Sequence, residues 1–85
     1  MKTRITEITE SAAPDCYKLE RKGQPTLFMP TFDTTEMSID DSVTMCATEY
    51  RIAIGRLPDI AEVFVWPANN RAAVGCFDVA GETEQ

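Results

Sequence analysis

The segment from Ser38 to Pro58 limits the fold most, because its pattern is typical of one α-helix. Apolar residues recur there at spacings of three and four, which is the helical period: Ile39, Val43, Cys46, Tyr50, Ala53 and Leu57. Ser38 is a suitable N-cap, and Asp40 and Asp41 stand in the first turn, where negative charge is favourable. Gly55 offers a C-cap and Pro58 prevents continuation, so the pattern predicts one helix that ends near Gly55.

The segments on both sides of this helix predict strands. Alternating or β-branched residues define them, and Lys22-Gly23 and residues 68–70 supply turns. The predicted strands are residues 3–9, 16–21, 26–29 (a short edge strand), 62–66 and 71–79. Hairpins that flank one helix favour an α+β fold, with an antiparallel β-sheet of four to five strands and the helix packed across one face. The expected order is β-β-(β)-α-β-β.

A chain of 85 residues is expected to form a single domain, residues 1–85, with a polar tail at 80–85 that is frayed. No leader segment, membrane span or lipidation signature is visible, so we expect a soluble, cytoplasmic protein. The three cysteines, Cys16, Cys46 and Cys76, form no close pair in the sequence, which favours a reducing compartment and structural roles for all three.

Several kinds of chemistry lack their usual residues. The chain contains no histidine, no Cys-x-x-Cys pair and no Gly-rich phosphate loop. We therefore expect no catalytic residues, no metal and no cofactor. One alternative stays open, an enzyme that relies on carboxylates alone, because Asp33, Glu36, Asp40 and Asp41 lie close together in the sequence.

Charge segregation favours a binding surface instead. The net charge is −6, and between Lys22 and Arg51 there are five acids and no base. Met45 and Ile52 project from the helix on the side of its acids rather than with the apolar stripe. The predicted partner-binding residues are Asp33, Glu36, Asp40, Asp41, Met45, Glu49 and Ile52. A basic protein surface is the expected partner, and direct contact with nucleic acid or membrane is not expected. Asp78, Glu82 and Glu84 form a second acidic stretch.

Phe64 and Trp66 alternate with Val63 and Val65, so the two pairs lie on opposite faces of their strand. A single helix covers only one face of a sheet, so one pair needs a loop, a second copy or a partner. Phe64 and Trp66 are therefore candidates for self-association in a homodimer. This leaves a second interpretation open, a small cytosolic regulatory or assembly subunit.

The first third of the chain also carries a family resemblance. Residues 8–10, Pro14, Tyr17 and residues 20–23, followed by one helix and a terminal hairpin, resemble small phage-encoded anti-CRISPR proteins. The two prolines around residues 26–29 and the apolar final hairpin need not match any one member of this class. It implies a non-catalytic inhibitor in the host cytosol, which docks an acidic, DNA-mimicking surface on a CRISPR-Cas surveillance complex or nuclease. DNA recognition or nuclease recruitment would then be blocked.

Overall fold

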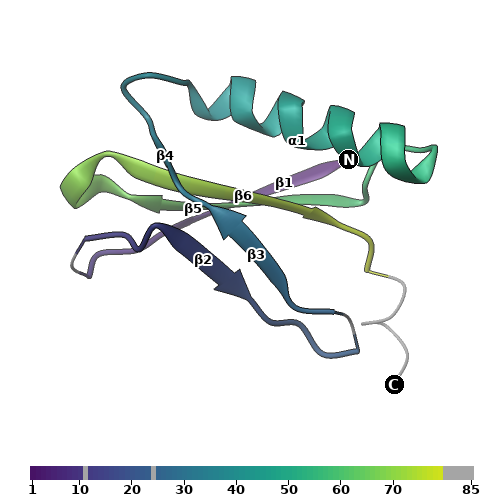
Figure 1. Cartoon of the computed structure of the whole chain (residues 1–85), viewed down its shortest axis with the longest axis horizontal. Helices are drawn as coiled ribbons and strands as arrows, with labels where there is room; N and C mark the ends of the chain where they lie inside the picture. Colours follow the sequence, from purple (N-terminus) through teal and green to yellow (C-terminus); the bar gives the residue numbers. More distant parts are fainter. Residues whose placement is uncertain (11, 24, 80–85) are drawn as a thin grey trace.

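A computed structural model describes residues 1–10, 12–23 and 25–79 of the chain in three layers: a helix, a four-stranded sheet and a two-stranded hairpin (Figure 1). The elements are β1 (Lys2–Glu7), β2 (Cys16–Leu19), β3 (Leu27–Pro30), β4 (Phe32–Asp33), α1 (Ile39–Ile54), β5 (Ile60–Trp66), a 3-10 turn η1 (Pro67–Asn69) and β6 (Arg71–Phe77). The α+β class with one helix is confirmed. The expected frayed tail at 80–85 lies outside the described residues.

The helix begins and ends where its local sequence predicts. The Ser38 Oγ accepts a hydrogen bond of 3.1 Å from the Asp41 amide, and Gly55 closes the helix with φ +96°. Its buried face differs in detail from the predicted stripe. The fully buried helix residues are Ser42 and Ala47, whose small side chains allow close approach to the sheet, whereas Leu57 lies beyond the end of the helix and is exposed.

The four-stranded sheet has the order β1-β5-β6-β4 and is mixed. Strands β5 and β6 form the expected antiparallel hairpin, and β4 pairs antiparallel with β6. The prediction of a purely antiparallel sheet is wrong at β1, which pairs parallel with β5 from Lys2↔Ile60 to Glu7↔Val65. A parallel pair needs a long crossover connection, and the segment containing β2, β3, β4 and α1 provides one.

Strands β2 and β3 form a separate antiparallel sheet that covers the face of β5 and β6 opposite α1. The Tyr17 ring lies 4.7 Å from the Phe64 ring and 5.4 Å from the Trp66 ring, between ring centroids. Phe64 and Trp66 are only 9% and 3% exposed. The expectation that they offer a self-association surface is therefore corrected, because the chain's own hairpin covers both rings.

Gly75 of β6 lies directly against the hairpin. A Cβ added at Gly75 would overlap the Met29 Sδ and lie 3.5 Å from the Leu19 Cδ2. Both Leu19 and Met29 are buried in the same core cluster as Phe64 and Trp66. The absence of a side chain at Gly75 thus lets the hairpin pack directly on β6.

Candidate functional site

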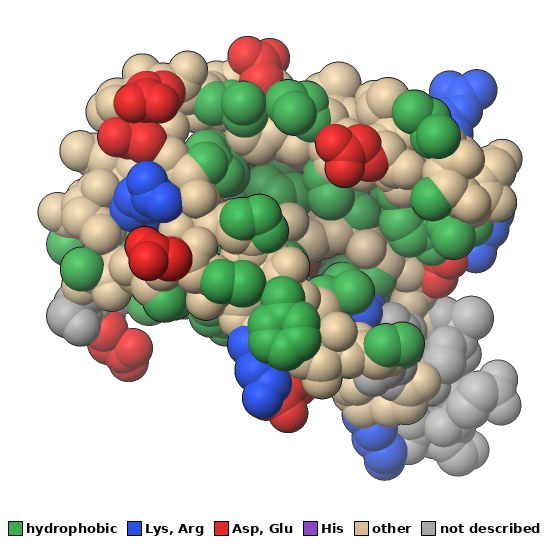
Figure 2. Space-filling model, viewed as in Figure 1, with side chains coloured by type: hydrophobic (Ala, Val, Ile, Leu, Met, Phe, Trp, Pro, Cys, Tyr) green, Lys and Arg blue, Asp and Glu red, His purple; other side chains and the backbone are tan. Residues whose placement is uncertain are grey.

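A groove runs between α1 and β3 along the edge of β6. Strand β4 pairs with β6 only at Phe32↔Ala72 and Asp33↔Arg71, and within residues 25–79 no other strand pairs with this edge. Figure 2 shows the resulting hollow, with hydrophobic side chains inside it and acidic side chains at its helix side. We call this hollow the α1–β3 groove.

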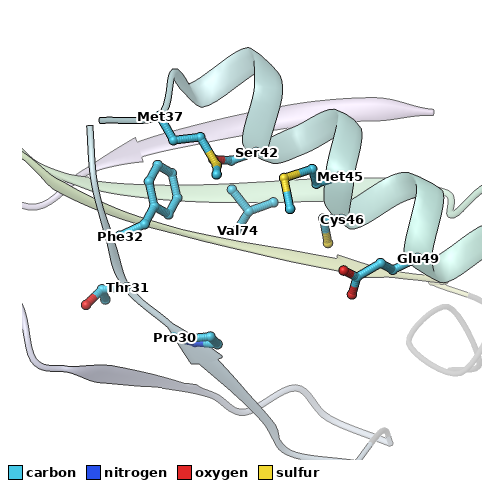
Figure 3. Close-up of a pocket in the computed structure, with 9 residues that line it drawn as sticks. All are labelled: Pro30, Thr31, Phe32, Met37, Ser42, Met45, Cys46, Glu49 and Val74. Carbon is cyan, nitrogen blue, oxygen red and sulfur yellow. The ribbon is translucent and has the colours of Figure 1, made fainter. Parts of the chain in front are cut away.

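The part of the groove next to β4 is a pocket of about 280 Å³ (Figure 3). Three elements supply its walls, namely the β3–β4 segment, α1 with its preceding turn, and β6. The lining residues are Pro30, Thr31, Phe32, Met37, Ser42, Met45, Cys46, Glu49 and Val74. Most of these side chains are apolar, so the pocket suits an apolar group.

Three polar residues stand in this apolar wall, and the hydroxyl of one of them, Thr31, is bonded to the Pro14 carbonyl and to Arg71. Glu49 projects from α1 at the rim, and no Lys or Arg of the described chain forms an ion pair with it. The Ser42 hydroxyl is buried and has no hydrogen-bond partner. An unpaired carboxylate beside apolar walls attracts a positively charged group that also carries an apolar part.

The groove continues past this pocket along β6. The next hollow shares Pro30, Cys46, Glu49 and Val74 with the first. A third hollow shares Leu27, Tyr50 and Cys76 with the second and ends at Arg21 and Asp78. The α1–β3 groove is therefore a series of connected hollows along the β6 edge and not a single isolated cavity.

Cys46 of α1 and Cys76 of β6 meet at the floor of this groove. Cys46 is half-buried, Cys76 is buried, and both are free thiols that line the same hollow. The Cys46 sulfur lies next to the side chain and the backbone amide of Cys76. This proximity lowers the pKa of Cys46, while the proximity of Cys46 and burial raise the pKa of Cys76.

Asp78 serves the fold rather than an open acidic surface. Its Oδ2 accepts hydrogen bonds from the Tyr50 hydroxyl and the Arg56 guanidinium, and its Oδ1 accepts from the Asp59 amide at 3.2 Å. The Tyr50 bond, chiefly, lowers the pKa of Asp78, while burial and this bond raise the pKa of Tyr50 to about 12. The other members of the second acidic stretch, Glu82 and Glu84, lie outside the described residues.

The predicted partner-binding residues divide into two groups. Met45 and Glu49 line the pocket, and Met45 is 49% exposed. Ile52 is 79% exposed further along α1 and is not a lining residue of any part of the groove.

The remaining predicted acids lie around the start of α1. The Asp33 carboxylate accepts hydrogen bonds from the hydroxyl (2.6 Å) and the amide (2.8 Å) of Thr35. These two bonds, the hydroxyl bond most of all, lower the pKa of Asp33. Asp33 therefore has a structural role in the turn before the helix. Glu36, Asp40 and Asp41 are exposed there and none of them lines the pocket, so the seven residues do not form one compact site.

Sequence reasoning missed the far wall of the groove. Phe32 and Val74 reach the pocket from segments that no local pattern links to α1. The meeting of Cys46 and Cys76 was missed for the same reason. Only the packing of α1 on β6 brings these residues together.

No family model, characterised protein or solved structure matches this chain. Within residues 1–10, 12–23 and 25–79, no helix has the length and apolar character that a membrane crossing requires. In the same described part of the chain, no group of three or more Cys, Asp or Glu residues is placed to hold a metal ion.

Proposed function

We propose that this chain is a non-catalytic binding protein that takes up a basic segment of a partner protein in the α1–β3 groove. The observation that carries the proposal is the apolar pocket with the unpaired Glu49 carboxylate at its rim. A groove with apolar walls and a few polar groups is typical of sites that bind a specific side chain.

An arginine or lysine side chain fits this pocket best by chemistry. Its aliphatic stem would lie against Phe32, Met37 and Met45, and its charge would reach Glu49. A purely apolar side chain would fill the same space but would bury the Glu49 charge without a partner, which costs free energy. The pocket therefore favours a cation with an apolar stem.

Charge outside the pocket supports the same kind of partner. The chain has a net charge of −6, and Glu36, Asp40 and Asp41 are exposed near the pocket's helix end. Such charges accelerate the approach of a basic partner and make binding sensitive to salt.

Within this class, we propose an inhibitor of a CRISPR-Cas surveillance complex or nuclease, as the family resemblance implies. Complexes that bind nucleic acid carry clustered Lys and Arg side chains, and these suit both the Glu49 pocket and the acidic residues around it. Binding there would block DNA recognition or nuclease recruitment. An interference assay that excess protein leaves unchanged would rule out this particular target while leaving the groove as a binding site.

The groove itself can be tested with synthetic peptides on isotope-labelled protein. Short peptides with a central arginine between apolar residues should shift the backbone amide NMR signals of Ser42, Met45 and Val74. Peptides with glutamine in place of arginine should bind more weakly. The Glu49→Gln variant should lose about five- to tenfold in affinity, as expected for one partly desolvated ion pair.

Glu7→Gln is the matched control, because Glu7 is exposed in β1 at the opposite edge of the sheet. It should bind the arginine peptide as the unchanged protein does. Equal affinity of the Glu49→Gln variant, or signal shifts confined to residues outside the groove, would contradict the proposal.

A small cytosolic regulatory or assembly subunit is the second candidate. It would use the same groove for a basic partner unrelated to CRISPR systems. A partner captured through the groove that has no role in nucleic-acid interference would favour this candidate.

A further inference from the structure

We propose that Cys46 and Cys76 form a reversible disulfide, which makes the floor of the α1–β3 groove a thiol-oxidation site. The co-reactant is a small-molecule disulfide such as oxidised glutathione. The inference is independent of what the groove binds.

The packing of α1 on β6 fixes this pair. Tyr50 contacts Asp78 at one end of the groove, and Ser42 and Val74 line the same pocket at the other. Cys46 lies one helical turn before Tyr50, about 6 Å along the axis. Cys76 lies two residues before Asp78, about 6.6 Å along the strand. Because these two distances along α1 and β6 are nearly equal, Cys46 and Cys76 lie opposite each other between the two elements.

The two thiols have complementary surroundings. Cys46 is half-buried and lines the groove, and the neighbouring Cys76 lowers the pKa of Cys46. Cys76 is buried, so Cys46 is the more exposed of the two thiols that line this hollow. This is the arrangement of an attacking thiol and a resolving thiol.

The reaction has two exchange steps. The Cys46 thiolate attacks one sulfur of glutathione disulfide, forms a mixed disulfide and releases a glutathione thiolate. The Cys76 thiol then passes its proton to that thiolate and attacks the Cys46 sulfur, which releases the second glutathione thiolate. This second thiolate takes a proton from the solvent, which balances the proton that Cys46 released when it ionised. The protein loses two electrons and two protons, and the glutathione disulfide is reduced to two glutathione molecules. In the product the two sulfurs are joined by a bond of about 2.05 Å.

The spacing of the cysteines supplies an internal control. Cys16 and Cys76 are each thirty residues from Cys46, so an unfolded chain closes the 16–46 and 46–76 loops with similar probability. Cys16 lies in β2, on the hairpin that covers the opposite face of the sheet. The folded chain should therefore form only the Cys46–Cys76 bond.

The experiment equilibrates the folded protein with mixtures of reduced and oxidised glutathione, then blocks free thiols and measures mass. We expect an internal disulfide, seen as the loss of two hydrogen atoms, and a covalent link between tryptic peptides 23–51 and 72–85. Dithiothreitol should reverse both. Cys16→Ser should retain the link, whereas Cys46→Ser and Cys76→Ser should each abolish it.

The same reaction in denaturant should give the 16–46 and 46–76 links in comparable amounts. Two results would overturn the proposal. One is a folded protein that links Cys16 to Cys46 as often as Cys46 to Cys76. The other is a folded protein in which Cys46 keeps a bound glutathione and no internal link forms.

Discussion

The contact between Gly75 and Met29 offers a sharp test of how the hairpin packs on the sheet. Replacing Gly75 by alanine places a Cβ where the Met29 Sδ lies, so the Met29 side chain must move within a closed core. Overpacking of this kind costs about 1–3 kcal/mol. Alanine in place of glycine within a strand returns about 0.5–1 kcal/mol through reduced backbone entropy. The net prediction is a loss of about 0–2.5 kcal/mol of unfolding free energy, with a middle value of about 1 kcal/mol.

Met29→Ala, the substitution at the other side of this contact, removes most of a side chain that is 4% exposed. Such truncations cost about 2–5 kcal/mol through lost burial and the cavity left behind. In the double variant the new Cβ at Gly75 occupies part of that cavity and meets no sulfur. The double variant should therefore be no less stable than Met29→Ala alone.

Urea unfolding followed by the fluorescence of Trp66, the chain's one tryptophan, measures all four proteins. The predicted coupling between the two changes is at least about 1 kcal/mol in favour of the double variant. Losses that add to within about 0.5 kcal/mol would mean that Gly75 and Met29 do not touch, and would refute the packing of the hairpin on β6.

Three further changes have clear expected outcomes. Ser42→Ala should raise the unfolding free energy by about 1 kcal/mol, because the change removes a buried hydroxyl that has no partner among the described residues and because alanine favours the helix. A lower stability of this variant in urea unfolding would mean that the hydroxyl is hydrogen-bonded. Asp78→Asn should cost about 1 kcal/mol at pH 7. The folded pKa of Asp78 is lowered, so its contribution is present above the unfolded value near 3.9 and is lost as pH falls through the folded value. The gap between the variant and the unchanged protein should close on acidification, and a constant gap would contradict this. Gly55→Ala should cost about 1 kcal/mol, because alanine is strained at φ +96° although no atom crowds it, and an unchanged thermal midpoint would contradict that.

Local signals predicted most of the secondary structure. Ser38 and Gly55 bound the helix because capping depends on neighbouring backbone groups only. Asn70 takes φ 55° at the end of the β5–β6 turn, as its side chain permits. Such features do not require knowledge of distant parts of the chain.

Long-range pairing was the part that the sequence did not reveal. The parallel alignment of Lys2 with Ile60 depends on which strand reaches the sheet edge, and no residue near Lys2 encodes that. The cover over Phe64 likewise comes from Tyr17, in a hairpin whose own pattern predicts only half-exposed strands. An alternating apolar pattern shows that a face is buried but does not identify what buries it.

The candidate site was predicted only where it lies on the helix. Met45 and Glu49 were identified because helical spacing separates them from the core stripe. Phe32 and Val74 complete the pocket through tertiary packing, and Asp33 proved to be held by Thr35 in the turn before the helix.

The most direct test of the central claim is affinity capture from a bacterial lysate at low and high salt. It compares the tagged protein with Glu49→Lys and with Glu7→Lys, which makes the same charge change at the opposite edge of the sheet. We expect the unchanged protein and Glu7→Lys to retain a basic nucleic-acid-binding complex at low salt and to release it at high salt, and Glu49→Lys never to retain it. Retention of the same complex by Glu49→Lys, or recovery of nothing but the protein itself, would contradict the proposal that the groove binds a basic partner through Glu49.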